Sequence, residues 1–181
     1  MADDDDDSGE DRVIYHPNRE EPAAKATRAI VVLLLIVAGV LTLIITAGGW
    51  KSLQGAVPVS IAFIIIYFIM AYYVWQWTRG LLPLAAGMSV MLGVFAAIAA
   101  FSSGSWFDRD ATGYDKHAQL PPALIGLLCV ILLPVLALLI AFAMRGFNQK
   151  WNIEIEMSRE EFEQKYRRNR RGGGGGQAQT A

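Results

Sequence analysis

The chain has 181 residues, enough for one domain of ordinary size, and 54% of them are apolar, a larger share than in typical soluble proteins. Its formal net charge is −1, so the chain has no basic bias toward nucleic acid, and no nucleic-acid partner is expected. Its single cysteine, Cys129, excludes an intramolecular disulfide and a cysteine-built zinc site.

The acidic residues are confined to three parts of the chain. Of the 17, nine lie in residues 1–21, three in 108–115 and five in 154–163. A soluble domain needs charge on its outward faces throughout its length. The long stretches between these clusters therefore predict that lipid, and not water, surrounds them.

Residues 1–28 form a polar leading segment with an unbroken acidic run from Asp3 to Asp7. Such a segment buries too little apolar surface to offset its ordering entropy. We therefore expect a disordered acidic tail in the cytoplasm.

Four long apolar runs follow within a predicted membrane domain at 29–147. Each has about the 20 residues that a helix needs to cross a hydrocarbon layer of ~30 Å. Barrel strands are about ten residues long and alternate in polarity, so the fold class expected is all-α and polytopic. The predicted transmembrane helices span about residues 29–47, 57–77, 81–101 and 121–146, with an outer loop at 102–119.

The first run is longer than the apolar core of an ordinary signal peptide, so we expect an uncleaved first span. The orientation follows from the basic residues. With both termini in the cytoplasm, thirteen basic residues lie inside and three, Lys51, Arg109 and Lys116, lie outside. Because cytoplasmic loops carry the excess of Lys and Arg, the expected topology is N-in and C-in.

Small residues recur every four positions along the third run, at Ala85, Ser89, Gly93 and Ala97. Positions four apart share a helix face, and small residues let two helices approach closely in lipid. We interpret the stripe as a helix-packing face. An alanine-rich helix can also show this spacing by chance.

No Asp, Glu, Lys, Arg or His lies within the apolar cores of the runs. Proton relays, ion-coupled transport and haem ligation usually need such a residue near the middle of the membrane. We therefore predict no catalytic, cofactor-binding or metal-binding residue, no cofactor, and no enzymatic activity.

The outer loop contains Asp108, Asp110, Thr112 and Gly113, which match the start of a calcium-binding EF-hand loop. The match fails at position twelve, where Gln119 replaces the bidentate glutamate. We interpret the loop as a turn-rich cap whose aromatic residues, Trp106 and Phe107, lie on the membrane interface.

Residues 148–171 are expected to form a cytoplasmic segment at the membrane surface. Apolar and polar residues alternate through 151–157, which predicts a short strand, and a capping box at 158–161 predicts a helix over about 159–170. A lone strand is not stable, so its apolar face needs the membrane surface, another copy or another protein. The residues expected at the membrane surface or a partner are Trp151, Ile153, Ile155, Lys165, Arg167, Arg168, Arg170 and Arg171. Residues 172–181 are predicted to be a flexible glycine-rich tail.

The stretches Trp106–Tyr114 and Ala141–Glu156 look like those of small uncharacterised four-span proteins from high-GC bacteria. This resemblance covers about a third of the chain and carries no catalytic residue and no assigned activity. It implies a bacterial inner (plasma) membrane as the location.

Three functions are compatible with the sequence. The leading hypothesis is a non-enzymatic membrane protein that docks to itself or to another membrane protein through its C-terminal segment. The alternative is a component of a transporter or channel for a small or lipidic solute. The third, an interfacial enzyme, would need the loop residues Asp108, Asp110, Asp115 and His117 as its chemical groups and is disfavoured.

Overall fold

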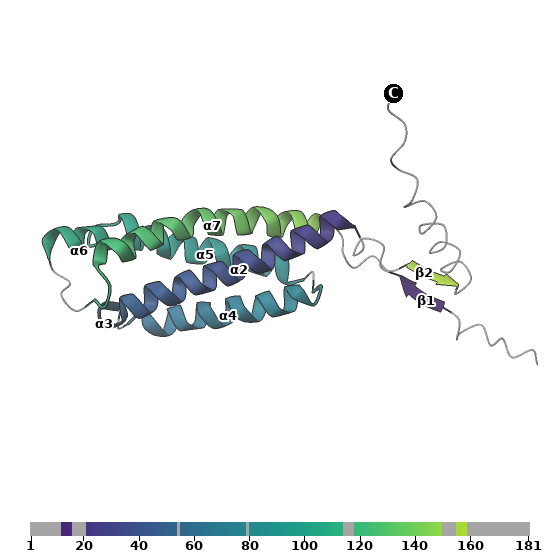
Figure 1. Ribbon diagram of the computed structural model, residues 1–181, viewed down its shortest axis with the longest axis horizontal. Helices are drawn as coiled ribbons and strands as arrows, with labels where there is room; N and C mark the ends of the chain where they lie inside the picture. Colours follow the sequence, from purple (N-terminus) through teal and green to yellow (C-terminus); the bar gives the residue numbers. More distant parts are fainter. Residues whose placement is uncertain are drawn as a thin grey trace, which may run out of the picture.

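A computed structural model of the chain shows a bundle of long helices with short helices at one end and a small sheet beyond the other (Figure 1). The residues that the structure describes are 12–15, 21–53, 55–78, 80–113, 118–149 and 155–158. The long helices are α2 (Pro22–Gly48), α4 (Val57–Trp75), α5 (Leu81–Phe101) and α7 (Pro122–Asn148). Two short helices, α3 (Trp50–Leu53) and α6 (Trp106–Thr112), lie in the connections.

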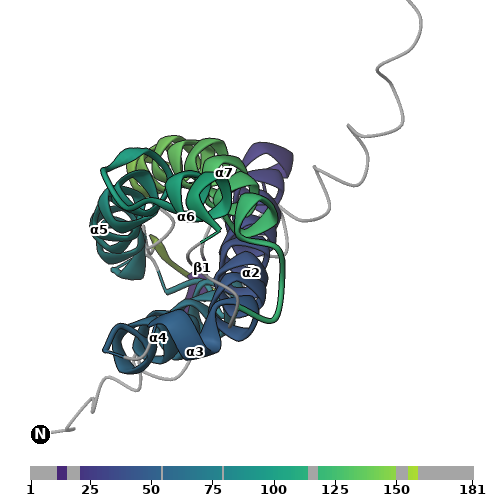
Figure 2. The ribbon, with the colours of Figure 1, turned by 90° about the vertical axis from the view of Figure 1, so that its left-hand side faces the viewer.

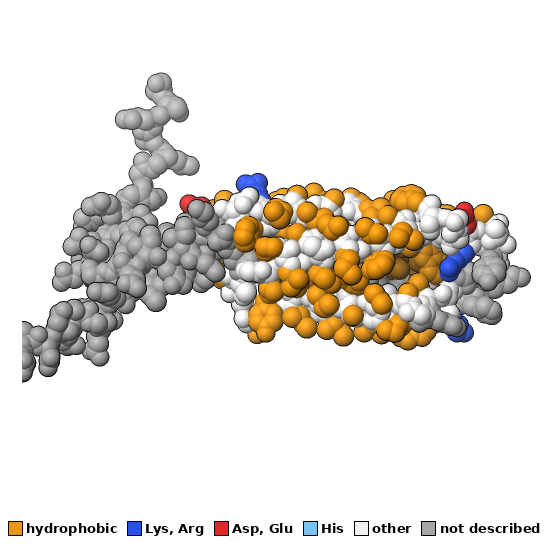
Figure 3. All heavy atoms as spheres, turned by 180° about the vertical axis from the view of Figure 1, so that it is seen from behind, with side chains coloured by type: hydrophobic (Ala, Val, Ile, Leu, Met, Phe, Trp, Pro, Cys, Tyr) orange, Lys and Arg blue, Asp and Glu red, His pale blue; other side chains and the backbone are white. Residues whose placement is uncertain are grey.

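The four long helices confirm the predicted helical spans as elements, because each is long and apolar enough to cross a bilayer. On the face that Figure 3 shows, charged side chains lie at the two ends of the bundle and apolar side chains cover the surface between them. The charge-free part of α2, residues 29–48, is about 30 Å long at 1.5 Å per residue. This length matches the hydrocarbon thickness of a bilayer.

Helix α2 begins earlier than predicted, at Pro22 instead of residue 29. Proline suits the first turn of a helix because its missing N–H would be unpaired there in any case. The expected disorder of residues 1–28 is therefore wrong for 22–28, and it is wrong for residues 12–15, which form strand β1 (Arg12–Tyr15).

The long helices follow one another around the bundle in the order α4, α2, α7, α5, as the end view shows (Figure 2). Helix α2 packs against both α4 and α7, and α5 packs mainly against α7. The centre is filled by fully buried side chains, among them Leu35, Tyr67, Leu82 and Leu139. The fourth side, between α4 and α5, is much more sparsely packed.

The connection between α5 and α7 closes one end of the bundle. Trp106 is only 3% exposed, so the prediction that it lies on the membrane interface is wrong. Its ring packs against the backbone at Gly49, where an added Cβ would lie 2.8 Å from the indole. The Phe107 ring packs in turn against the backbone at Gly126. The Asp110 carboxylate accepts a hydrogen bond from the N–H of Ala123 in the first turn of α7.

A two-stranded antiparallel sheet joins the two terminal segments. Strand β1 pairs with β2 (Ile155–Ser158), and Val13 lies opposite Met157. The C-terminal strand was expected to need the membrane or another chain as its partner, but the described part of it pairs with the N-terminal segment of the same chain. Residues 151–154, the helix predicted at 159–170 and the tail at 172–181 lie outside the described residues.

The close approach of Trp106 to α2 can be tested with a matched pair of glycine substitutions. Gly49→Ala should destabilise the bundle by about 1–3 kcal/mol, because the new methyl group overlaps a buried ring. Gly87→Ala should be neutral or stabilising, because nothing lies within 4 Å of its added Cβ and alanine favours a helix. Thermal unfolding in mild detergent measures both; equal midpoints for the two variants would contradict the packing described.

Candidate functional site

The side of the bundle between α4 and α5 is held by few direct contacts. The rings of Phe63 and Phe95 meet edge to face, with centroids 6.0 Å apart. One helical turn further along α4, the Tyr67 hydroxyl donates a hydrogen bond of 3.2 Å to Ser89 Oγ. The Ser89 hydroxyl in turn donates to the carbonyl of Ala85, at 2.7 Å. These contacts form a seam between two helices that otherwise pack on α2 and α7.

A cavity of about 310 Å³ lies along this seam, in the half of the bundle nearest α3 and α6. The back view shows a recess at that end of the bundle, surrounded by apolar side chains (Figure 3). All four long helices contribute to its walls. The lining residues are Thr42, Ile45, Thr46, Leu53, Ala56, Val59, Ser60, Phe63, Leu92, Phe95, Ala96, Ile98, Ala99, Trp106, Cys129 and Leu132.

The cavity presents little polarity to an occupant. Thr42 and Thr46 each donate their hydroxyl hydrogen to the carbonyl four residues earlier in α2, at 2.8 and 2.7 Å. Back-bonding of this kind is common for hydroxyls in membrane helices, where an unpaired donor is costly. Ser60 is the third hydroxyl of the lining, and the described residues supply no hydrogen-bond partner for its side chain.

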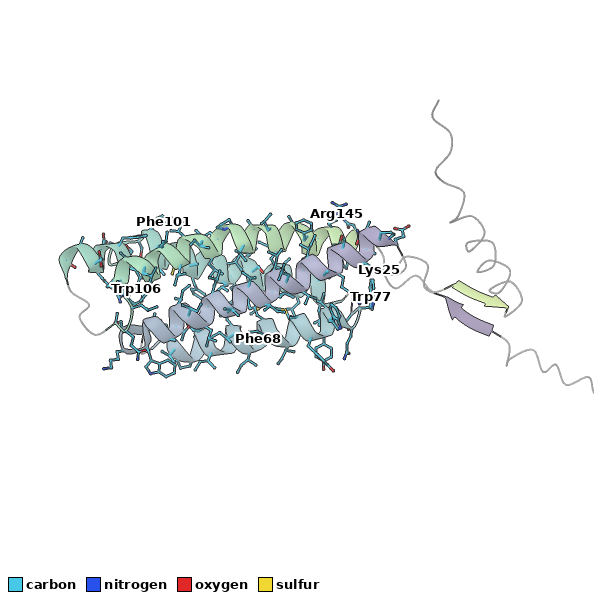
Figure 4. All side chains as sticks on the ribbon, in the orientation of Figure 1. Lys25, Phe68, Trp77, Phe101, Trp106 and Arg145 are labelled. Atoms are coloured by element: carbon cyan, nitrogen blue, oxygen red, sulfur yellow. The ribbon has the colours of Figure 1, made fainter. Side chains whose placement is uncertain are left out.

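The lining residues place the cavity along the axis of the bundle. Trp106 and Leu53 form its roof, and Figure 4 shows Trp106 at the α3–α6 end of the bundle. Phe63, Leu92 and Leu132 form its floor, above the Tyr67–Ser89 hydrogen bond. The side wall includes Val59, Phe95 and Ile98, whose exposed faces would be covered by hydrocarbon in a bilayer.

A second, more open hollow of about 330 Å³ lies on the same seam toward the other end of the bundle. It is bounded by Tyr73 and Thr78 and by apolar side chains of α4 and α5, such as Ile69 and Leu84. The seam is thus incompletely filled on both sides of the Tyr67–Ser89 bond.

At the far end of the bundle, an arginine joins α2 to the end of α4. The guanidinium of Arg28 lies 4.6 Å from the ring centre of Trp75 and 4.2 Å from that of Trp77, and it donates a 3.1 Å hydrogen bond to the Trp75 carbonyl. Trp77 has a φ of +66°, which costs about 1–2 kcal/mol for a side chain other than glycine. Stacking of a cation on the indole offsets part of this cost. The contact ties the C-terminal end of α4 to α2.

The predicted small-residue stripe lies partly on the seam. Ala85 and Ser89 are fully buried, whereas Gly93 and Ala97 are partly exposed. A Cβ on Gly93 would meet α7 only at an ordinary distance of 3.8 Å, from Leu136. The role of the stripe in close helix packing stays a prediction.

Most of the predicted surface residues fall outside the described part of the chain: Trp151, Ile153, Lys165, Arg167, Arg168, Arg170 and Arg171. The structure places Ile155 in β2, opposite Tyr15. Sequence reasoning missed the cavity, because its walls are ordinary apolar residues from four separate helices. Within the described residues, no cluster of three or more His, Cys, Asp or Glu could hold a metal ion.

Four helices that are long and apolar enough to cross a membrane indicate a multi-pass membrane protein, and an apolar cavity lies between α4 and α5. Comparisons with protein-family models, curated proteins and solved structures found no match for this chain. The resemblance to four-span proteins of high-GC bacteria therefore stays a prediction.

The cysteine in the cavity wall reports whether the roof is closed to water. Cys129 should react slowly with a charged, membrane-impermeant thiol reagent, and Trp106→Ala should accelerate that reaction roughly tenfold by removing the indole above it. Phe107→Ala is the control, because Phe107 is not part of the cavity lining and packs on Gly126. Equal reaction rates in Trp106→Ala and Phe107→Ala, measured by mass spectrometry, would show that Trp106 is not the roof.

Proposed function

We propose that this chain is a non-enzymatic membrane protein that takes up a lipidic molecule sideways from the bilayer, as a component of a transporter for such a solute. The observation that carries the proposal is the apolar cavity on the α4–α5 seam, with lipid-facing residues in its side wall. A cavity of this size and lining is of the kind that binds small apolar molecules.

The chemistry of the walls supports binding over catalysis. Acyl transfer or hydrolysis needs a nucleophile beside a general base, and proton transfer needs an acid or base close to the reacting atom. The cavity is lined by three hydroxyls and one thiol, and two of the hydroxyls already donate to helix carbonyls. The described carboxylates of the bundle, those of Glu21, Asp108 and Asp110, lie at its ends, outside the lining.

The same walls favour a lipidic solute over an ion. Ion pathways are lined by carbonyl oxygens, charged side chains or water-filled constrictions. Here the carbonyls are bonded within helices, and the floor of the cavity is built from Phe63, Leu92 and Leu132. With the predicted N-in and C-in orientation, the cavity would accept its solute from the outer leaflet.

A substitution that fills the cavity tests the proposal. Ala96 is 5% exposed and lines the cavity, so Ala96→Phe should place a ring in the space and lower lipid occupancy roughly tenfold. Val94 lies on the same helix but is 54% exposed, so Val94→Phe should leave occupancy unchanged. Occupancy is measured as covalent labelling by a photoactivatable fatty acid in native membranes, followed by mass spectrometry.

Labelling of the Ala96→Phe protein at the parental level would refute lipid uptake at this site. A loss of labelling counts only if the variant keeps the parental unfolding temperature. Ala99→Phe, on the same cavity wall, serves as a second filling variant if Ala96→Phe is unstable.

A second function, docking of the terminal segments to a membrane partner, is favoured by the sheet of β1 and β2. Two strands alone are marginal in water, so this sheet gains stability if a further strand or surface covers it. Both of its strands are edge strands, and an extended segment of another protein could add to either one. The docking element proposed here is thus the paired termini, not the C-terminal segment alone.

A cysteine pair tests whether the sheet forms within one chain. Arg12 and Ser158 are directly opposite each other, so Arg12→Cys with Ser158→Cys should form a disulfide on mild oxidation in a Cys129→Ala background. The product should migrate as a monomer on a denaturing gel. A disulfide-linked dimer would assign the pairing to two copies, and Arg12→Cys combined with Glu156→Cys, which is out of register, is the control.

A further inference from the structure

The size and polarity of the cavity indicate which part of a lipid it accommodates. We propose that it holds one hydrocarbon chain, with the first oxygen of the attached head accepting a hydrogen bond from Ser60. This inference rests on the proposed function and adds to it the class of ligand and its direction in the site.

The volume limits the occupant to a single chain. An apolar cavity of about 150 Å³ accommodates one benzene molecule, which has six carbons. The present cavity of about 310 Å³ therefore has room for about a dozen carbons. Both chains of a phospholipid would not fit, so a two-chain lipid could insert only one of them and would leave the other in the bilayer.

The position of Ser60 sets the direction of the chain. Ser60 lies one helical turn from the start of α4 at Val57, close to the α3–α6 end of the bundle. Lys51 and the carboxylates of α6 lie at that end, where lipid headgroups would meet the protein. The opposite end of the cavity is a floor of Phe63, Leu92 and Leu132. A chain bound here therefore points toward the middle of the membrane, with its polar head toward α3 and α6.

Among the hydroxyls of the lining, that of Ser60 is the one whose hydrogen is not donated to a carbonyl of the described residues. Thr42 and Thr46 have already committed their hydrogens to carbonyls of α2, whereas the described residues supply no such acceptor for Ser60. In an apolar environment an unpaired hydroxyl is costly, and an oxygen at the head of the chain removes that cost. The same bond distinguishes an oxygen-bearing chain from a plain hydrocarbon.

Competition between two matched probes in lipid nanodiscs tests this inference. Dodecan-1-ol and dodecane have the same chain, and each competes with a photoactivatable fatty acid for labelling of the full-length protein. Dodecan-1-ol should reduce labelling at about a fivefold lower mole fraction than dodecane, as expected for one hydrogen bond. Ser60→Ala should abolish this difference and Ser60→Thr should retain it. Ser102→Ala, which removes a hydroxyl outside the cavity lining, is the matched control.

The outcomes separate this inference from the proposed function. If Ala96→Phe abolishes labelling but the two probes compete equally, apolar binding stands and the role of Ser60 is wrong. If Ala96→Phe leaves labelling unchanged, both fail. Labelled peptides should come from residues 56–63 and 92–99, and labelling spread over all lipid-facing surfaces would also overturn the inference.

A final comparison identifies the source of the chain. Lysophosphatidylcholine and phosphatidylcholine with the same acyl chain compete in separate experiments. Stronger competition by lysophosphatidylcholine assigns the site to single-chain amphiphiles. Equal competition assigns it to one chain of an ordinary bilayer lipid. Competition by neither compound, while dodecan-1-ol competes, would exclude a phospholipid head and limit the ligand class to chains with a small head.

Discussion

Water is absent from the hydrocarbon layer of a bilayer, so each backbone N–H and C=O within it must find its partner inside the protein. The helices α2, α4, α5 and α7 meet this requirement over about 30 Å, and the same requirement restricts their side chains. The hydroxyls of Thr42, Thr46 and Ser89 all donate to carbonyls one turn earlier. Charged groups are placed where water or headgroups can solvate them. The Arg28 guanidinium, for example, lies at the bundle end, over the rings of Trp75 and Trp77, and donates a hydrogen bond to the Trp75 carbonyl.

Packing between the helices is driven by contact area, since lipid tails are as apolar as the side chains they would replace. The buried face of α5 consists mainly of alanine, and this face lies close against α7. Along the seam, α4 presents bulky residues such as Phe63 and Tyr67, which reach α5 only at isolated points. The space left between those points costs dispersion energy, because the atoms lining a void lack partners on one side. A hydrocarbon chain taken up as proposed would restore those contacts at the most sparsely packed side of the bundle.

The spans were predictable from sequence because the absence of charge over about 20 residues is a local property. The neighbours of each helix were not, because they depend on how four apolar surfaces fit together. The stripe at Ala85, Ser89, Gly93 and Ala97 shows why the packed face of a helix is harder to predict than the helix itself. A spacing of four residues drifts by about 40° per step around a helix with 3.6 residues per turn. The stripe therefore leaves the buried face after two steps, and that face continues through Leu92 and Ala96. Trp106 was assigned to the interface from its residue type, but the bare backbone at Gly49 leaves room for its ring inside the bundle.

The pairing of β1 with β2 was the least accessible feature, because its partners are separated by most of the chain. Alternation of apolar and polar residues in a single segment predicts a strand but does not identify what it pairs with. The arrangement of the helices determines which segment the strand can pair with. An even number of antiparallel helices brings the start of α2 and the end of α7 to the same end, as Figure 1 shows. Holding the two terminal segments at one end raises their effective concentration and removes most of the entropy cost of joining them. A sheet too small to be stable by itself is thus stabilised by the helices that hold its two strands at one end of the bundle.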